Sequence, residues 1–590
     1  MCKLKNILQI LLLIIIVIIC YANSLSSPFV WDDEVMIVEN PLIRNFSHVS
    51  KVFSSSAFGE SLSDSNFYRP IQILTYMWDY FIWKLNPIGY HITNIMLHLL
   101  TVMLVLILLR QLGLSRAASF ITSALFAVHP INIEAVTYIS GRGDLLYLLF
   151  CLASFSVFLM GVKKCVYKKN NSSAVSKTQN IVLVNRWSAL IISLAFYFLA
   201  LLSKENAVTL PLIIGLYILL FKNRIQIKPA LFGLAGLISL MTGFTAIRLT
   251  GVFTSVSTTL SHIASADLMQ RIFTLPYIIW TYFRLLLIPY PLHMEYHYVA
   301  SSILNPYLIL GMPLLIGAGW VVLRYVKPVG YVKPANYVLF GFGWFFIALG
   351  PVYNVLVVLA STVREHWASF PGLGILLIAG LLIEKGYHQL KSKKLLKILF
   401  ICLVILYIFG LCISTIIRNI DWQDPMRLYT HDAMLEPRSV LLYNNIGVIH
   451  FRNKDYEKAK QAFQQSIDVS PGTGYATAYN NLGVILENQG DITNAVKHYK
   501  ASIVLGKYEL AYVNYAGILL KNKESIQAIT LLKQGLTHYP NNPELYYFLG
   551  HAYLQNQQFP QAYQTFENVQ TLAPGYKNTQ MIIEGFHSKQ

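Results

Sequence analysis

The stretch Ile7–Ala22, "ILQILLLIIIVIICYA", decides the class of this protein. An apolar run of this length is typical of a helix that crosses a lipid bilayer, and similar runs recur as far as Ile417. The chain has 590 residues, of which 55% are hydrophobic and only 13% are charged. Soluble domains carry roughly 25% charged residues. The sequence therefore predicts a polytopic membrane domain, followed by a more polar, soluble domain.

The first hydrophobic segment has a signal peptide as its alternative interpretation, since "MCKLKN" and the apolar run fit the first two regions of one. The apolar core is long for that role and "CYANS" is a poor cleavage site, so a retained helix is favoured. About eleven spans are expected, near 6–24, 92–110, 117–137, 144–162, 187–202, 206–221, 229–247, 304–323, 336–354, 366–384 and 396–417. A further apolar stretch, 271–291, is expected to be re-entrant or interfacial, because it contains Pro276, Arg284 and several aromatic residues.

The net charge of +18 is explained by the membrane topology rather than by a surface that binds nucleic acid. Basic residues cluster in short connections such as "RQLGLSR", "KNRIQIK" and "KGYHQLKSKKLLK". Cytoplasmic loops carry such an excess, so the N-terminus is predicted to be cytoplasmic and the soluble domain extracytoplasmic. None of the six cysteines forms a CxxC pair, which argues against a zinc site of the usual spacing or a disulfide framework.

Ionisable residues that neither packing nor topology explains are all predicted to lie on the outer face. Such groups at the ends of membrane helices are costly unless they are paired or face a wet cavity, so their convergence indicates a site. Separate snorkelling side chains and local salt bridges are the alternative. The set comprises Asp32, Asp33, Arg69, His129, Glu134, Arg142, Asp144, Lys204, Glu205, Arg364, Glu365 and His366.

The soluble tail repeats itself at intervals of about 34 residues, as in "YNNIG…DYEKAKQAFQQSIDVSP" and "YNNLG…DITNAVKHYKASIVLG". This is the tetratricopeptide (TPR) pattern of paired helices, here in four copies. The expected segments are a membrane domain over 1–420 with a first external loop at 25–90, a connector over 421–439 and a TPR domain over 440–590. The TPR groove is expected to bind peptide through recurring asparagines, with a spacer or homotypic contact as the alternative. These asparagines are Asn444, Asn445, Asn480, Asn481 and Asn514.

The acidic pair Asp32 and Asp33 lies in "SSPFVWDDEVMIVENP" (26–41), just after the first predicted helix. At an outer membrane surface a carboxylate can act as a general base on a hydroxyl group. It can also bind a divalent cation that neutralises a phosphate leaving group. Adjacent side chains rarely point the same way, so one aspartate is expected to face the site and the other to orient the loop.

The ordered segments "FVWDDEVMIVENPLI", "FYRPI", "HPINIEAVTYISGRGDLL", "LSKENA", "VREHWASFPGLG" and "RNIDWQDPMRLY" precede the repeats. In this order they resemble the transmembrane and TPR repeat-containing protein O-mannosyltransferases, members of the GT-C class of membrane glycosyltransferases. The resemblance implies an all-α, GT-C-like membrane bundle and a polyprenyl-phosphate-linked sugar, mannose, as the donor. It implies that Asp32 or Asp33 deprotonates a Ser or Thr hydroxyl, with Asp33 slightly favoured.

A lipid-linked donor also requires cations at the outer surface to hold its phosphate. The candidates are Arg69, Arg142, Lys204 and Arg364, supported by His129, Glu134, Asp144, Glu205, Glu365 and His366. No metal site and no firm cofactor are predicted, although a divalent cation is compatible with this chemistry. The expected partners are the lipid-linked donor, an acceptor polypeptide and the bilayer, without nucleic acid.

Two departures from the family pattern leave the sugar and the acceptor open. The acidic residue of the "AERxLYxPS"-type segment appears within "VREHWASFPGLG", and "YPLHMEYHY" (290–298) places Glu295 between His293 and His297. The second segment matches no zinc motif and is interpreted as an interfacial aromatic belt. A non-catalytic membrane-anchored TPR scaffold is the alternative function, and a transporter is a weaker one. A prokaryotic plasma membrane is favoured over the endoplasmic reticulum.

Overall fold

The computed structural model describes residues 2–54, 67–163, 185–248, 261–325, 334–390, 393–470, 475–506 and 508–587. The chain divides into two compact units, Met1–His431 and Asp432–Gln590. The described residues are helical almost throughout, and the only extended pairings among them are the isolated bridges Lys163–Ile225 and Tyr296–Val363. The predicted all-α class, a helical membrane bundle followed by a TPR solenoid, is confirmed. Cys165 and Pro471 lie outside the described residues.

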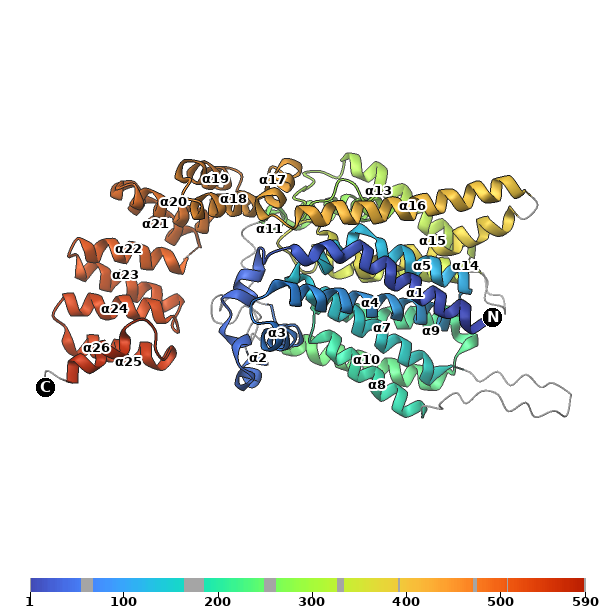
Figure 1. The fold of residues 1–590 in the computed structure, drawn as a ribbon, viewed down its shortest axis with the longest axis horizontal. Coiled ribbons are helices and arrows are strands. Elements are labelled where there is room, and N and C mark those ends of the chain that lie inside the picture. Colours follow the sequence, from blue (N-terminus) through green and yellow to red (C-terminus); the bar gives the residue numbers. More distant parts are fainter. Residues whose placement is uncertain are drawn as a thin grey trace. The chain divides into compact units, whose positions relative to one another are not determined.

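The first unit is a bundle of long apolar helices that lie roughly parallel to one another (Figure 1). Eight helices in the described part of the chain are long and apolar enough to span a membrane, or nine if α5 and its bent continuation form one span. Arg186–Leu201 and Pro306–Gly317 are shorter apolar helices. The apolar helices of this unit, long and short, are α1 (Cys2–Tyr21), α4 (Pro87–Leu112), α5 (Arg116–Val128), α7 (Arg142–Val162), α8 (Arg186–Leu201), α9 (Leu210–Phe221), α10 (Ile227–Ile247), α12 (Leu268–Leu287), α13 (Pro306–Tyr325), α14 (Pro334–Leu349), α15 (Ser369–Gln389) and α16 (Lys394–Asp421).

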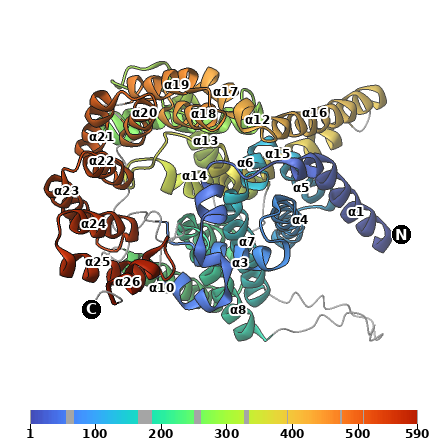
Figure 2. The same cartoon turned by 60° about the vertical axis from the view of Figure 1, so that its left-hand side comes forward.

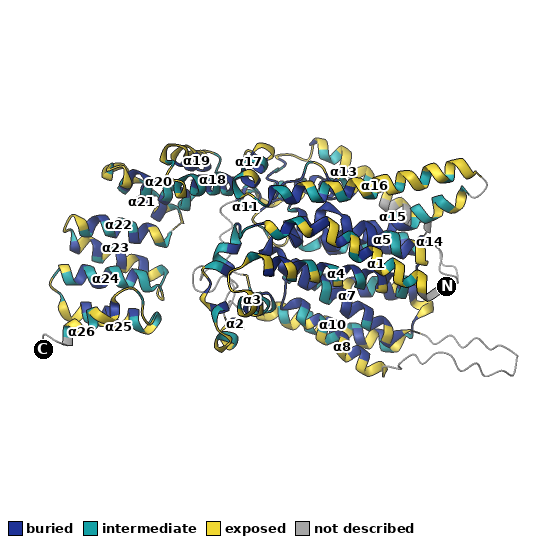
Figure 3. Cartoon of the chain, viewed as in Figure 1, coloured by how far each residue is buried: buried dark blue, intermediate teal, exposed yellow. Residues whose placement is uncertain are grey.

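Burial within the bundle is uneven, as expected when lipid covers the outer helices. Helix α7 lies in the centre, with 83% of its apolar window buried, whereas α16 has only 6% of its window buried (Figure 3). Small residues let neighbouring helices approach closely, as in other membrane bundles. At the contact between α14 and α15, a side chain added to Gly341 or Gly374 would collide with the backbone of the other glycine. The core therefore lies around α7.

Irregular segments at one end of these helices carry most of the predicted site. Residues 22–54 form short turns, including Glu34–Val38 and Pro41–Arg44, before α2 (Val49–Val52) and α3 (Pro70–Trp83). The chain bends again at α6 (Ile133–Val136), just before α7. Further along, α11 (His262–Ser265) precedes α12, and the bridge between Tyr296 and Val363 joins the segments on either side of α13 and α14.

The second unit is a set of antiparallel helix pairs that stack into a curved array (Figure 2). Glycines at the crossings admit aromatic rings: a side chain on Gly447, Gly483 or Gly550 would strike Phe463, Tyr499 or Phe566, respectively. The helices are α18 (Val440–Arg452), α19 (Tyr456–Asp468), α20 (Ala476–Asn488), α21 (Ile492–Gly506), α22 (Glu509–Lys521), α23 (Ser525–His538), α24 (Pro543–Gln555), α25 (Phe559–Leu572) and α26 (Thr579–His587). Helix α17 (Pro425–Leu435) runs from the first unit into the second.

Candidate active site

The structure gives the two adjacent aspartates different surroundings. Asp33 is fully buried, and its carboxylate accepts hydrogen bonds from the Ser140 N–H (2.7 Å), the Ser140 hydroxyl (2.5 Å) and the Val30 N–H (3.0 Å). Asp32 is half-buried, and its main-chain N–H donates to the Tyr138 hydroxyl at 3.1 Å. The Tyr138 hydroxyl in turn donates to the Asp32 carboxylate. Asp33 therefore fixes the loop, and Asp32 presents its carboxylate beside it.

Two of the predicted cations are paired with carboxylates at the ends of α7 and α8. Lys204 holds both oxygens of Asp144, at 2.8 and 2.7 Å, and both side chains are almost completely buried. Arg69, which immediately precedes α3, contacts Glu205 at 3.1 Å and retains 12% of its side-chain exposure. Each cation is thus held in place before any ligand is bound.

Arg364 is held by a residue that was not predicted for the site. Its Nη2 lies 2.6 Å from an oxygen of Glu295, which is fully buried, while the Arg364 side chain is 14% exposed. The second oxygen of Glu295 lies 3.3 Å from His297. The interpretation of "YPLHMEYHY" as an aromatic belt misses this role, because Glu295 is buried at the site instead of at a lipid interface.

His366 and Glu365 occupy the turn before α15. His366 Nδ1 lies 2.7 Å from Glu134, and its Nε2 lies 3.8 Å from Asp144, so one imidazole connects two acidic residues. Glu365 instead accepts hydrogen bonds from the His293 N–H (2.6 Å) and the Tyr296 hydroxyl (3.1 Å). Glu365 thus holds the 290–300 segment against the bundle, whereas His366 is part of the charged cluster.

Electrostatic interactions connect these pairs into one site. Burial raises the pKa of Asp32, while the positive charges of Arg364 and Arg69 and the Tyr138 hydrogen bond oppose that rise. Burial lowers the pKa of Lys204, against the opposing charge of Asp144. The same Asp144 acts on Arg69, and Glu134 acts on Arg364. Asp32 therefore lies within electrostatic reach of two arginines that come from different loops.

Two of the predicted site residues, Arg142 and His129, are fully buried and make contacts that hold the fold together. Arg142 has no exposed surface and engages Asp79 (2.6 Å), Asn94 (2.7 Å), the Tyr90 carbonyl (3.0 Å) and Thr75 (3.2 Å). This arrangement leaves it no surface for a phosphate, in contrast to the role predicted from the sequence.

His129 is also fully buried. Its Nδ1 accepts the Ile131 N–H at 3.2 Å, and its Nε2 lies 3.1 Å from the Leu286 carbonyl. His129 therefore caps the short helix that follows α5 and ties it to the end of α12, rather than contributing to the charged cluster.

Several site residues are absent from the sequence-based set. Besides Glu295, they include Tyr138 and Trp422, whose rings stack with centroids 5.5 Å apart, and Arg248, whose charge acts on Glu205. Trp422 lies in "RNIDWQDPMRLY", one of the segments that carry the family resemblance, so the sequence did contain a signal for this residue. Nothing in the spacing of Tyr138 or Glu295 relates them to Asp32 or Arg364.

In the described parts of the chain, no group of three or more His, Cys, Asp and Glu side chains is arranged to hold a metal ion. The divalent cation considered from the sequence stays a prediction.

The predicted TPR asparagines lie side by side and form a chain of hydrogen bonds. Asn514 donates to Asn480 at 2.9 Å, and Asn481 donates to Asn444 at 3.1 Å. Weaker contacts of 3.4 Å join Asn480 to Asn481 and Asn444 to Asn445. The side-chain amides of three successive repeats therefore form one continuous row.

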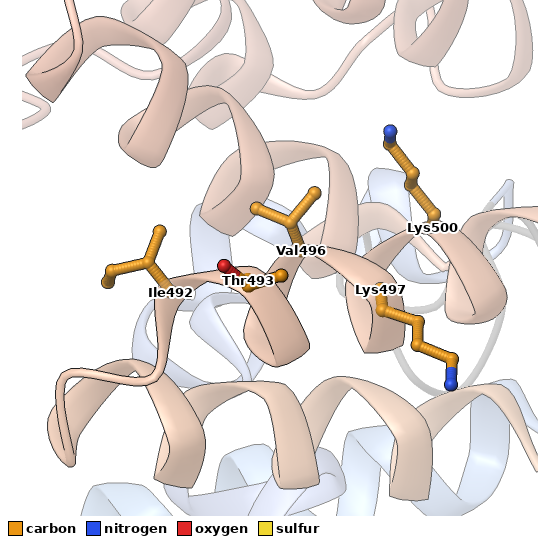
Figure 4. Close-up of a pocket in the computed structure, with 5 residues that line it drawn as sticks. All are labelled: Ile492, Thr493, Val496, Lys497 and Lys500. Carbon is orange, nitrogen blue, oxygen red and sulfur yellow. The ribbon is translucent and has the colours of Figure 1, made fainter.

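A separate surface hollow of about 520 Å³ lies on α21 (Figure 4). It is lined by Ile492, Thr493, Val496, Lys497 and Lys500. Because none of the predicted groove asparagines lines it, this hollow is distinct from the asparagine row.

The fold and the site define a membrane helical bundle with a buried acid–base cluster and a TPR tail. Tetratricopeptide repeat models match residues 438–503 and 511–578. Mouse Protein O-mannosyl-transferase TMTC3 is 25% identical over 93% of this chain and 62% of its own length. The Drosophila melanogaster Tmtc3 is 24% identical over 89% of the chain and 63% of its own length. The Caenorhabditis elegans Protein O-mannosyl-transferase F38B6.6 is 26% identical over 79% of this chain and 63% of its own length.

The resemblance to the O-mannosyltransferases is confirmed over most of the chain, although the chain spans less than two thirds of the length of these relatives. Among solved structures, the MamA protein of Desulfovibrio magneticus RS-1 is 21% identical over 25% of this chain and 84% of its own length, with a TM-score of 0.23.

Proposed function

We propose that this protein is a membrane glycosyltransferase that moves mannose from a polyprenyl-phosphate donor to Ser or Thr hydroxyls of proteins on the extracytoplasmic side. The observation that carries the proposal is the half-buried Asp32 carboxylate within electrostatic reach of Arg364 and Arg69. The names of the relatives support mannosyl transfer to protein. The donor and the side of the membrane rest on the site and on the positions of the basic loops.

Asp32 is the proposed general base. Its carboxylate is oriented by the Tyr138 hydroxyl, as a base in an active site needs to be. Asp33 is unsuited to that role because its two oxygens already accept three hydrogen bonds inside the loop. The geometry thus favours Asp32, the reverse of the slight preference taken from the sequence.

The transfer step follows from these positions. Asp32 takes the proton of the acceptor hydroxyl as its oxygen attacks the anomeric carbon of mannose. The bond from that carbon to the lipid-phosphate oxygen breaks, and the phosphate leaves with the electron pair. Attack from the face opposite the leaving group inverts the configuration at the anomeric carbon.

Arg364 and Arg69 are the proposed phosphate ligands. Both are paired through one contact to a carboxylate and remain partly exposed, so each retains N–H donors for a phosphate oxygen. Lys204 is bound by both oxygens of Asp144 and is nearly buried, so its role is to hold that carboxylate beside His366. A cation pair at the ends of membrane helices suits a donor whose chain lies in lipid and whose phosphate lies at the surface.

The TPR unit is the proposed acceptor-binding element. The half-buried Asn481 and Asn514 present amide groups of the kind that pair with an extended peptide backbone, while the buried Asn444 and Asn480 accept hydrogen bonds from them and hold them in place. Such binding depends little on the side chains of the acceptor, which suits an enzyme that modifies hydroxyls in many sequences.

The decisive experiment is mannosyl transfer by purified, reconstituted protein from labelled polyprenyl-phosphate mannose. Asp32→Asn is expected to lower transfer by about 10²-fold or more, the usual contribution of a general base. Glu39→Gln changes an exposed acid in the same loop and is the matched control, expected to transfer at the wild-type rate. Asp33→Asn is expected to lower both activity and stability, because it disrupts the contacts with Ser140.

Wild-type transfer by a folded Asp32→Asn protein would remove Asp32 from the mechanism. If the wild-type protein transfers mannose to no acceptor but retains peptides through its TPR unit, the scaffold alternative replaces the enzyme.

A further inference from the structure

The residues around the proposed base form a tight and strained turn. The Asp33 N–H donates to the Val30 carbonyl at 3.0 Å, which closes the turn around Trp31 and Asp32. Trp31 has a φ of 55°, a left-handed conformation that is unfavourable for a bulky side chain. Backbone strain of this kind persists only where surrounding contacts enforce it.

The backbone of three successive residues in this turn is held by three different side chains. Val30 donates to Asp33 at 3.0 Å, and Asp32 donates to the Tyr138 hydroxyl at 3.1 Å. Between them, a hydrogen bond joins the backbone of Trp31 to the Tyr429 hydroxyl. The turn is therefore fixed from three directions, by its own loop, by the segment before α7 and by α17.

The contacts from α16 and α17 are made by buried aromatic rings. Tyr429 packs edge-to-face on Trp31, with ring centroids 5.7 Å apart. Trp422, the C-cap residue that follows α16, stacks on Tyr138. Asp421 fixes this junction through Arg427 (2.9 Å) and Arg418 (3.2 Å).

We propose that the α16–α17 junction positions the base: Tyr429 directly, and Trp422 through Tyr138, hold the strained Trp31–Asp32 turn so that the Asp32 carboxylate faces the two arginines. These are positioning residues, and the inference rests on the proposed function. Their contacts reach the backbone of the turn and not the cations, so they set the place of the base without setting the affinity for the donor phosphate.

The first test separates catalysis from binding. Tyr429→Phe keeps the ring and removes the hydroxyl, and it is expected to lower kcat by about tenfold or more while the donor KM changes by less than about twofold. Tyr353→Phe is the matched control, because the Tyr353 hydroxyl also has one main-chain partner, the carbonyl of Phe346, and burial, rather than any charged group of the site, raises its pKa. Tyr138→Phe is expected to shift the acidic limb of the pH–rate profile to higher pH, because Asp32 loses a hydrogen bond to its charged form.

A second measurement does not depend on activity. Amide hydrogen exchange of the segment containing Trp31 and Asp32 is expected to become faster in full-length Tyr429→Phe and to stay unchanged in Tyr353→Phe. If both Tyr429→Phe and Tyr138→Phe show wild-type kcat, pH profile and exchange while Asp32→Asn is inactive, the junction has no positioning role and the proposed function stands. If no protein transfers mannose, the proposed function fails, and the exchange result still decides whether the junction holds the turn.

Discussion

Burial and hydrogen bonding shift the pKa of Asp33 in opposite directions, and the effect of burial is the larger. Burial raises the pKa of Asp33 from 3.8 to about 7, although the hydrogen bonds from Ser140 and Val30 oppose the rise. Folded protein therefore retains a proton on Asp33 between about pH 4 and pH 7, whereas the unfolded chain releases it. Because the folded state binds more protons in this window, Asp33 makes the free energy of unfolding fall as the pH rises.

This behaviour predicts a pH-dependent difference between the wild type and Asp33→Asn. The thermal midpoint of the wild type is expected to fall relative to that of the variant as the pH rises from about 4 to about 7, and to stay at a constant offset above that range. The measurement is thermal unfolding of full-length protein in detergent, with Glu39→Gln as an exposed control. A constant offset across the whole range would contradict the raised pKa.

At the level of single residues, the sequence predicted which charged residues lie together more successfully than it predicted the role of each. The predicted Asp32, Arg69, Asp144, Lys204 and Arg364 do lie in one electrostatic cluster. The division of labour within the acidic pair depends on the strained turn at Trp31, and no local pattern predicts a left-handed tryptophan. Arg142 shows the same limit, since its partners come from α3 and α4, about 50 to 70 residues before it in the chain.

At the scale of elements, the TPR helices cross where small residues admit a ring. An atom added at Gly483 would lie 2.7 Å from the Tyr499 ring, which is fully buried and bonded to Glu487 at 3.0 Å. The ring has little freedom to move, so Gly483→Val is expected to destabilise this pair by about 1–3 kcal/mol. Gly585→Val is the matched control, because nothing lies within 4 Å of the added atom in α26.

Hydrogen exchange of full-length protein checks this effect within the second unit. Amides of α20 and α21 are expected to exchange about 5- to 150-fold faster in Gly483→Val than in Gly585→Val, in line with that loss of stability. Equal exchange in the two variants would show that the crossing tolerates a side chain.

Periodicity also explains which elements the sequence predicts well. Long apolar runs and the 34-residue repeat each impose a regular spacing, so α1, α7, α16 and the TPR helices follow directly from the chain. The short turns at 22–54, 130–141 and 290–305 have no such period, and tertiary contacts shape them. Asp32, Tyr138 and Glu295 lie in these segments, which is why the contacts of Tyr138 with Asp32 and of Glu295 with Arg364 emerged only from the structure.

At the scale of the whole molecule, the first unit gathers its buried charges where the loops 22–54, 202–205 and 361–366 meet the helix ends. Positive-inside counting predicts that this end faces away from the cytoplasm. A membrane enzyme that used a lipid-linked donor would need base, cations and donor phosphate at one surface. The orientation of the chain is therefore a condition of the proposed chemistry.

The chain contains its own reporters of orientation. Asn45 in "NFS" is exposed and lies in the predicted first external loop, while "NNSS" places Asn170 and Asn171 in the predicted cytoplasmic loop between α7 and α8. N-glycosylation acts on such sites only in the lumen. When the protein is expressed in eukaryotic cells, Asn45 is expected to gain a glycosidase-sensitive mass that Asn45→Gln abolishes.

Asn170→Gln combined with Asn171→Gln is expected to leave that mass unchanged, because the loop is predicted to face the cytoplasm. The opposite pattern, in which the mass survives Asn45→Gln and disappears with the double substitution, would reverse the topology. Asp32 and its arginines would then lie on the cytoplasmic side, where an extracytoplasmic acceptor cannot reach them. The orientation measured at Asn45 therefore tests the proposed transfer independently of any assay of activity.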